Sequence, residues 1–425
     1  MTEAPSSIAE AAGKRLAKRY AAERRFQWYG RAAIIVALAF LVILIGRIVS
    51  QGISTFWTHE ITVAVYLDPA KIDRTNLPGV NFDYMVSEAL LKAVGETDDD
   101  LGERSGEAGE LASRDFGFRI LDMVKANPNL IGQTVTLTGL VGTKADLYFK
   151  GEIKLATPES ERQLTNRQIA WLDRLKGAGA IRSGFNTTFL THGDSTEAEQ
   201  AGVLGAIIGS AMTLLVAGLL AVPIGVLAAV WLEEFAPKNR WTDLIEVNVN
   251  NLAAVPSIVY GLLGLAVFIN WLHVPRSSPL VGGLVLALMA LPTMIIATRS
   301  ALKAVPPSVR EAALGVGASK TQTVFHHVLP LAGPGIMTGA ILSMSHALGE
   351  TAPLLMIGMV ISMTGLPQGF ASAATVLPVQ VFIWENASER GFHERTAAAI
   401  MVLLTFMIIM NGLAIFLRSR FERRW

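Results

Sequence analysis

Six stretches of this sequence are long and apolar enough to cross a lipid bilayer, and this feature constrains the fold more than any other. A helix that spans the hydrocarbon core needs about 20 apolar residues. Of the 425 residues, 51% are hydrophobic and only 17% are charged, which is too apolar for an ordinary soluble domain. We predict an all-α polytopic membrane protein with six transmembrane helices, at residues 32–50, 202–232, 247–272, 280–298, 333–362 and 396–417.

Basic residues at both ends of the chain predict its orientation. Seven Lys and Arg residues precede the first apolar stretch, so we expect residues 1–31 to be a basic cytoplasmic tail and residues 32–50 to stay as the first helix of a multi-pass inner (plasma) membrane protein. Six crossings return the other terminus to the cytoplasm, place residues 51–200 outside and place the loop 299–332 inside. The carboxyl-terminal tail agrees, with Arg418, Arg420, Arg423 and Arg424.

Residues 51–200 form an acidic block without a membrane-length apolar run. They hold 22 acidic and 15 basic residues, a net charge of −7. Alternating stretches that begin at Ile61 and Thr134 predict strands, and helical patterns follow at 84–94, 114–125 and 165–176. The charged stretch 96–110 predicts a loop. We therefore predict a small α+β extracytoplasmic insertion, which cannot hold disulfides or thiolate metal sites because the chain has no cysteine.

A carboxylate in the fifth apolar stretch is the strongest candidate for a substrate site. Charged groups in a membrane span are costly, so Glu350 within SMSHALGETAPLLMIG predicts a functional site with a partner. His346 lies one helical turn earlier on the same face, Thr351 is adjacent, and Pro353 allows a kink. This polar stripe predicts either a substrate pathway or polar contacts between helices at a subunit interface.

The cytoplasmic loop PPSVREAALGVGASKTQTVFHHVLPLAGPG predicts a compact helix-turn-helix. Ser308 and Glu311 have the spacing of a capping box, and Gly315 and Gly317 allow a turn. Lys320 lacks the preceding glycine of a phosphate-binding loop, so we expect no ATP hydrolysis by this chain alone. No metal cluster or nucleophile motif is present in the sequence either, and we predict neither a catalytic nor a metal-binding residue.

The same loop resembles the EAA loop of ATP-binding-cassette importer permeases. The matching residues fit the spacing of that motif, although His327 stands where an aliphatic residue is usual. The resemblance implies a coupling helix that docks into a separate ATPase subunit, which uses the ATP, so this chain binds no cofactor. The residues concerned are Glu311, Ala312, Ala313, Gly317, Leu329 and Pro330.

Two further stretches narrow the resemblance. VPSIVYGLLGLAVF from Val255 and GETAPLL from Gly349 resemble the phosphate-specific transport permeases, in particular the PstA subunit, over residues 200–425. The resemblance implies a five-helix permease core at 201–425 that forms half of a phosphate pathway. The implied partners are a second, PstC-like permease, two copies of an ATP-binding subunit, an extracytoplasmic phosphate-binding protein, phosphate and the lipid bilayer, without nucleic acid.

Within that family, arginine is usual where this chain has His346, which is a weaker and pH-dependent ligand for phosphate. A lone carboxylate repels phosphate, so we expect Glu350 to be protonated or paired with a cation. The candidates are His346, Arg299 and a basic residue of the second permease. Arg299 is also explained as an anchor at the cytoplasmic face.

Two alternative functions remain open from the sequence. In the first, the chain is a permease for another oxyanion, such as phosphonate or sulfate. In the second, it is a membrane sensor or scaffold in which residues 51–200 detect an external signal. For that insertion we predict contact with the binding protein or another subunit, against the alternative of an insertion without a role in transport.

Overall fold

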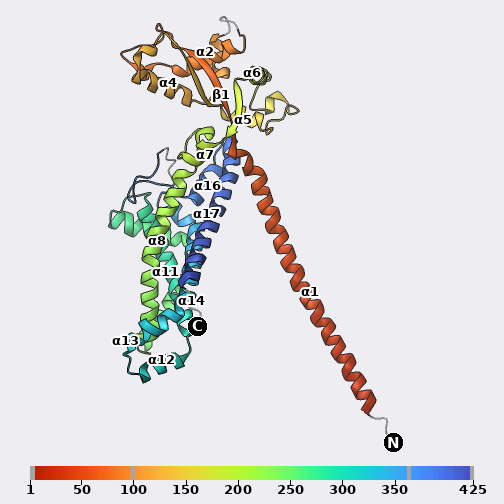
Figure 1. Ribbon diagram of the computed structural model, residues 1–425, viewed down its shortest axis with the longest axis vertical. Coiled ribbons are helices and arrows are strands. Elements are labelled where there is room, and N and C mark those ends of the chain that lie inside the picture. Colours follow the sequence, from red (N-terminus) through yellow and green to blue (C-terminus); the bar gives the residue numbers. More distant parts are fainter. Residues whose placement is uncertain (1–4, 97–100, 361–364, 422–425) are drawn as a thin grey trace. The chain divides into compact units, whose positions relative to one another are not determined.

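A single long helix forms the amino-terminal unit of the structure. The computed structural model describes residues 5–96, 101–360 and 365–421, and the chain divides into two units that meet between Gln51 and Gly52. In the first unit, α1 (Pro5–Gly52) runs for 48 residues (Figure 1), about 70 Å of helix at 1.5 Å per residue. It contains the predicted span 32–50, and the basic segment before that span continues the same helix.

The second unit contains a bundle of apolar helices. Its long members are α8 (Leu204–Val230), α11 (Pro279–Lys303), α14 (Leu329–Gly349) and α17 (Gly391–Phe421) (Figure 1). Glycines allow α11 to approach both α8 and α14. A Cβ added to Gly283 would lie 2.4 Å from Val216 Cβ, and one added to Gly339 would lie 2.5 Å from Ala297 Cβ. Larger side chains at these positions would separate the helices.

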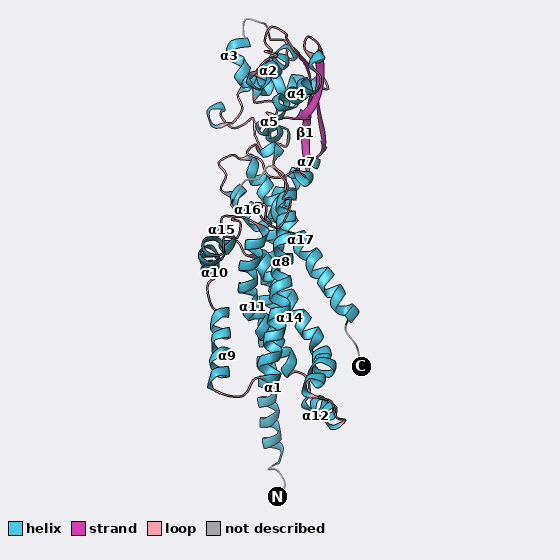
Figure 2. Cartoon of the chain, turned by 90° about the vertical axis from the view of Figure 1, so that its left-hand side faces the viewer, coloured by secondary structure: helices cyan, strands magenta, loops and turns pink. Residues whose placement is uncertain are grey.

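The number of spans depends on one bent pair of helices. Among the described residues, five helices, α1 included, are long and apolar enough to cross a membrane, or six if the bent pair counts as one span. The pair consists of α9 (Arg240–Ala253) and α10 (Ser257–Leu263), the latter continued by a π-helical stretch (Gly264–Trp271). The two segments meet at 104° (Figure 2).

This bend corrects the continuous helix that we predicted at 247–272. Pro256 lies between the two segments with φ −55° and ψ 137°, outside the helical region. Proline has no N–H for a helical hydrogen bond and disfavours helical geometry in the residue before it. The residues around Pro256 are apolar on both sides, so the sequence pattern does not show the interruption.

The helix predicted at 333–362 is also too long. α14 begins at Leu329 and ends at Gly349, and Glu350 has the extended backbone angles φ −78° and ψ 126°. Proline at position 353 has no N–H to donate to the carbonyl of Gly349, which weakens a helix that would continue through this position. A short helix, α15 (Ala352–Met356), follows the break, and Ser362 lies outside the described residues.

The carboxyl-terminal part contains a helix that we did not predict. α16 (Leu377–Glu385) precedes α17, and α17 contains the predicted span 396–417. Arg418 and Arg420 lie in the last turn of α17. Arg423 and Arg424 lie outside the described residues.

Residues 57–185 contain a three-stranded antiparallel sheet in the order β2-β1-β3. The central strand is β1 (Trp57–Tyr66), and its partners are β2 (Thr134–Leu140) and β3 (Ile181–Phe185). The two predicted strands are confirmed, and β3 is additional. Ile61, Val63 and Val65 alternate toward the interior and are nearly inaccessible, as expected for a strand with one covered face.

Three helices cover this sheet, and they confirm the three helices predicted from the sequence. They are α2 (Phe82–Ala93), α4 (Asp115–Ala126) and α6 (Asn166–Gly177). A shorter helix, α5 (Thr143–Phe149), follows β2. The loop predicted at 96–110 is wrong over α3 (Leu101–Gly109), whereas residues 97–100 lie outside the described part. A Cβ on Gly109 would lie 2.8 Å from Ser87 Oγ of α2, so packing on α2 overrides the polar composition of α3.

Candidate functional site

The structure brings together His346 and Glu350. His346 Nε2 lies 3.2 Å from Glu350 Oε1, across the last turn of α14. The side chain of His346 is 68% exposed in this chain, whereas that of Glu350 is 18% exposed. The imidazole and the carboxylate therefore lie side by side at the carboxyl end of α14. Their role in a substrate pathway stays a prediction.

The chain after Glu350 packs against α10. Thr351 precedes α15, and its carbonyl accepts hydrogen bonds from the backbone N–H groups of Leu354 and Leu355, at 3.1 and 3.0 Å. A Cβ on Gly261 of α10 would lie 2.7 Å from Pro353 Cα. The two stretches that carry the resemblance, VPSIVYGLLGLAVF and GETAPLL, therefore pack directly against each other. Their contact fixes the backbone on which Glu350 and Thr351 lie.

Arg299 does not join the His346–Glu350 pair. Its guanidinium contacts Glu233 at 3.4 Å and Glu246 at 2.5 Å, and its side chain is 13% exposed. Lys303 adds a second cation to Glu233 at 3.6 Å. Of the partners that we considered for Glu350, the structure therefore shows contact with His346 and engages Arg299 elsewhere. The Arg299 cluster joins α11 to α9 and to the π-helical end of α8 (Trp231–Phe235).

The predicted coupling loop contains the short helix α12 (Pro307–Gly315). Glu311 and Ala312 are exposed, and Ala313 is buried. Gly317 follows with φ +92°, a conformation that glycine adopts without the steric cost that other residues incur. The chain then enters α13 (Lys320–Gln322), a π-helical stretch (Thr323–Val328) and α14, which begins at Leu329 with Pro330 in its first turn.

The capping box predicted from Ser308 and Glu311 does not form. Pro306 is the N-cap residue of α12 and Pro307 occupies the first turn, so Ser308 is already inside the helix. Proline is favoured at the first helical position because its missing N–H would have no helical partner there. A capping box forms instead at α13, where Gln322 N donates to Ser319 Oγ and Ser319 N donates to Gln322 Oε1. Glu311 is therefore free of the capping role.

A buried ion pair that the sequence analysis did not identify attaches α12 to the end of α8. Arg310 Nη2 lies 2.6 Å from Glu234 Oε1, and the Glu234 side chain is 9% exposed. The same guanidinium donates to the carbonyls of Val305 and Leu302, at 2.9 and 3.0 Å. The signal in the sequence is the Glu233-Glu234 pair directly after an apolar span, opposite several basic residues in the next loop.

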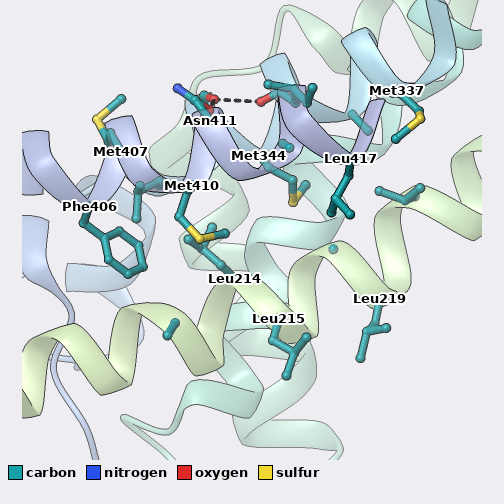
Figure 3. A pocket seen from close by; sticks show the side chains of 18 residues that line it. Leu214, Leu215, Leu219, Met337, Met344, Phe406, Met407, Met410, Asn411 and Leu417 are labelled. Carbon is teal, nitrogen blue, oxygen red and sulfur yellow. Dashed lines mark hydrogen bonds between the residues drawn. The ribbon is translucent and has the colours of Figure 1, made fainter. Parts of the chain in front are cut away.

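An apolar groove of about 590 Å³ lies between α8, α14 and α17 (Figure 3). Its lining consists of Leu, Met, Ala and similar side chains, with one polar pair, in which Ser345 Oγ and Asn411 Oδ1 are 2.5 Å apart. No charged side chain of the described residues lines it. This groove suits apolar surface and is no site for an anion.

Comparison with known proteins assigns both parts of the chain. Residues 221–425 match the family described as binding-protein-dependent transport system inner membrane component, and residues 13–159 match a domain of unknown function, DUF3333. The phosphate transport system permease protein PstA 1 of Mycobacterium tuberculosis (strain CDC 1551 / Oshkosh) is 32% identical over 257 residues, which are 60% of this chain and 83% of that protein.

Two other proteins illustrate the range of similarity. The probable ABC transporter permease protein YqgI of Bacillus subtilis (strain 168) is 36% identical over 171 residues, 39% of this chain and 56% of that protein. Among solved structures, an inward-facing conformation of the MetNI methionine ABC transporter superposes with a TM-score of 0.44 at 18% identity, over 52% of this chain and 96% of that chain. The structural likeness is too weak to support a functional argument.

The apolar helices and the matched family define a multi-pass membrane permease of an ATP-binding-cassette importer. The chain is 32% identical in sequence to a PstA protein over 83% of that protein's length, and it therefore belongs to the PstA family of phosphate transport system permeases. It is a transport subunit and not an enzyme by itself.

Proposed function

We propose that this chain forms one half of the translocation pathway of an ATP-driven phosphate importer. A second, PstC-like permease forms the other half, two copies of an ATP-binding subunit dock on the cytoplasmic side, and an extracytoplasmic phosphate-binding protein delivers the substrate. Both termini are cytoplasmic and residues 51–200 are extracytoplasmic, in agreement with the basic residues before the first span and at Arg418 and Arg420.

The observation that carries this proposal is the identity of 32% over 83% of a protein named for phosphate transport. The matched family is named for transport that depends on a binding protein, which supports the delivery partner. Phosphonate or sulfate stays the alternative substrate, because oxyanions of similar size and charge make similar demands on a pathway.

The geometry of α12 supports a coupling role. Glu311 and Ala312 are exposed, and so are two apolar side chains at the turn, Leu314 at 51% and Val316 at 86%. Exposed apolar residues flanked by polar ones are typical of a protein interface. Leu329 and Pro330 begin α14. A movement of α12 would therefore be transmitted to α14, the helix that contains His346 and ends just before Glu350.

For the pathway, we propose that His346, Glu350 and Thr351 contact phosphate, and that Arg299 does not. In this proposal the imidazole N–H of His346 donates a hydrogen bond to a phosphate oxygen. Glu350 holds the imidazole in place, and a protonated Glu350 would itself donate a hydrogen bond to phosphate. Arg299 is already neutralised by Glu233 and Glu246, so releasing it for substrate would leave two carboxylates with a single remaining cation, Lys303.

Uptake of radiolabelled phosphate into vesicles that hold the complete importer tests the proposal. We expect saturable, ATP-dependent uptake that excess sulfate and phosphonate leave unchanged. A complex that hydrolyses ATP but transports phosphate no faster than vesicles without ATP would overturn the assignment of substrate. If sulfate or phosphonate at equal concentration inhibits phosphate uptake, that oxyanion would become the assigned substrate in place of phosphate.

A further inference from the structure

Two large aromatic side chains lie exposed at one end of the sheet. Trp57 is the first residue of β1 and Phe185 is the last residue of β3, and the two are register partners. Their ring centroids are 6.4 Å apart with the planes at 82°, a T-shaped pair. Trp57 is 50% exposed and Phe185 is 53% exposed. Exposed aromatic pairs of this size normally mark a contact surface.

The pair lies close along the chain to the point where the apolar part of α17 begins. A Cβ on Gly52 would lie 2.7 Å from the backbone of Ala397 and Ala398 in α17. The last charged residue before the apolar run of α17 is Arg395, so Gly52 touches α17 at the start of its apolar part. Only the short 3₁₀ helix Ile53–Phe56 separates Gly52 from Trp57, about 8 Å at 2 Å per residue.

With the start of the apolar part of α17 at the edge of the hydrocarbon core, a separation of about 8 Å reaches the headgroup region. A bilayer has a hydrocarbon core of about 30 Å within a total of about 40–45 Å, which leaves roughly 5–8 Å of headgroup on each side. Trp and Tyr are enriched at this level because their rings are apolar at one end and polar at the other. The ring of Trp57 forms no hydrogen bond within the part of the chain that the structure describes, so its N–H is available to a headgroup or to water.

The junction fixes which side chains point outward. Asn186 donates its side-chain amide to the carbonyl of Thr55 at 2.9 Å, and its backbone N–H donates to the carbonyl of Phe56 at 2.9 Å. Phe56 packs edge-on against Phe189, with ring centroids 5.6 Å apart, in a cluster that includes buried Trp384. Phe56 therefore faces the protein, whereas Ile53 is 46% exposed and continues the exposed apolar surface to Trp57.

The next level of the sheet is charged. Glu60 and Arg182 are register partners on β1 and β3, three residues away from the aromatic pair on each strand, and both are exposed. The order along these strands is therefore apolar at Ile53, aromatic at Trp57 and Phe185, and charged at Glu60 and Arg182. The same order occurs from the hydrocarbon edge through the headgroups to water.

We propose that Trp57 and Phe185, together with Ile53, insert into the headgroup region of the bilayer and anchor the membrane-proximal end of the sheet to lipid. The proposal depends on α17 crossing the membrane and is independent of the transported substrate. Ile53 and Trp57 lie within residues 13–159, which match a domain of unknown function, whereas Phe185 lies beyond that match.

The absence of cysteine makes a direct test possible. Nitroxide spin labels are attached to the single-cysteine variants Trp57→Cys, Phe185→Cys and Tyr66→Cys of the full-length chain in liposomes, and the unsubstituted chain treated identically gives the background. Tyr66 is the matched control, because it ends the same strand and is 54% exposed, about 30 Å from Trp57 at 3.3 Å per residue. Collision rates with oxygen, which concentrates in lipid, and with a water-soluble nickel chelate are then compared.

We expect labels at 57 and 185 to collide more with oxygen than with the nickel chelate, and the label at 66 to show the reverse. Equal behaviour at 57 and 66 would overturn the proposal, and so would a label at 57 that is sheltered from both reagents, which indicates a protein partner. A second measurement avoids cysteine. Moving the indole with Trp57→Phe and Tyr66→Trp should lower the fluorescence quenching by brominated lipids below that of the unsubstituted chain, because the other seven tryptophans are common to both proteins. Unchanged quenching would contradict lipid contact at Trp57.

Discussion

Lys150 Nζ lies 3.1 Å from Glu394 Oε2, and this ion pair joins the sheet-containing insertion to the first turn of α17. The same ammonium group lies 2.7 Å from Asp146 Oδ2, and His59 Nδ1 lies 2.9 Å from the other oxygen of that carboxylate. The side chains of Lys150 and Glu394 are 9% and 13% exposed. Gly391 allows this approach, because a Cβ there would lie 2.3 Å from Thr143 Cγ2 of α5.

Lys150→Met should destabilise the protein strongly. The substitution leaves two buried carboxylates without their shared cation, and breaking a buried ion pair in this way costs about 3–5 kcal/mol. Thermal unfolding in detergent measures the effect. The matched control is Lys71→Met, which removes the exposed pair with Glu88 and should cost about 0–1 kcal/mol. Similar losses for the two variants would mean that the Lys150 pair is not a structural link.

The stability of this junction should depend on pH in two opposite ways. Burial alone would raise the pKa of Asp146, but the hydrogen bond from His59 and the charge of Lys150 outweigh it and hold that pKa below its ordinary value. A carboxyl group with a lowered folded pKa stabilises the protein above its unfolded pKa, about 4, and this contribution is lost as the pH falls toward the folded pKa.

Burial raises the pKa of Glu389, just before α17, and the nearby Glu199 and Glu197 raise it further, whereas a hydrogen bond from Thr143 opposes them. For this group, protonation favours the folded state, so stability rises as the pH falls through its raised pKa toward about 4.5. We expect the unfolding temperature to be highest at mildly acidic pH. Glu389→Gln should reduce the rise from neutral to mildly acidic pH, and an unchanged profile in this variant would contradict the assignment to Glu389.

Glu350→Gln should lower phosphate uptake by about tenfold or more. The substitution keeps the size of the side chain and removes the carboxylate that lies 3.2 Å from His346 Nε2. Uptake is measured beside ATP hydrolysis, which should persist. Ser345→Ala, on the same helix but bonded to Asn411, is the control and should transport nearly normally. If Glu350→Gln transports with unchanged rate and affinity, Glu350 has a packing role only.

Arg310→Met should detach α12 from the end of α8. Glu234 then has no cation beside it, and the carbonyls of Leu302 and Val305 lose the hydrogen bonds that Arg310 donates. We expect the amides of α12 to exchange hydrogen faster by at least tenfold, and ATP hydrolysis to lose its dependence on substrate. Arg310→Lys keeps the charge without the fork geometry and should be intermediate. Normal exchange in Arg310→Met would mean that other contacts hold α12.

The sequence predicts well the features that follow from periodicity and length. The apolar runs, the strands at Ile61 and Thr134, and the contact of His346 with Glu350 at one helical turn all follow from local patterns. The breaks at Pro256 and Glu350 are missed because both lie within long, mainly apolar runs, whose overall composition is the same whether the run is one helix or two. Proline in a span permits either a kink or an end.

The ion pairs are missed for a different reason. Arg299, near the end of α11, and Arg310, in α12, belong to a stretch where many basic residues fit the positive-inside pattern. Their partners Glu233, Glu234 and Glu246 come from segments more than 50 residues earlier. Only the fold decides which of these charges meet. The same holds for Lys150 and Glu394, which are 244 positions apart.

The central position of β1 sets an order of events during synthesis. β1 leaves the ribosome first, yet both of its hydrogen-bonding edges stay open until β2 and then β3 have been made. An open edge invites pairing with other chains. β3 ends at Phe185, shortly before α8 begins at Leu204, so the sheet is completed only as the second membrane span is being inserted. An unfinished sheet must therefore be kept from aggregation while more than half of the chain is still untranslated.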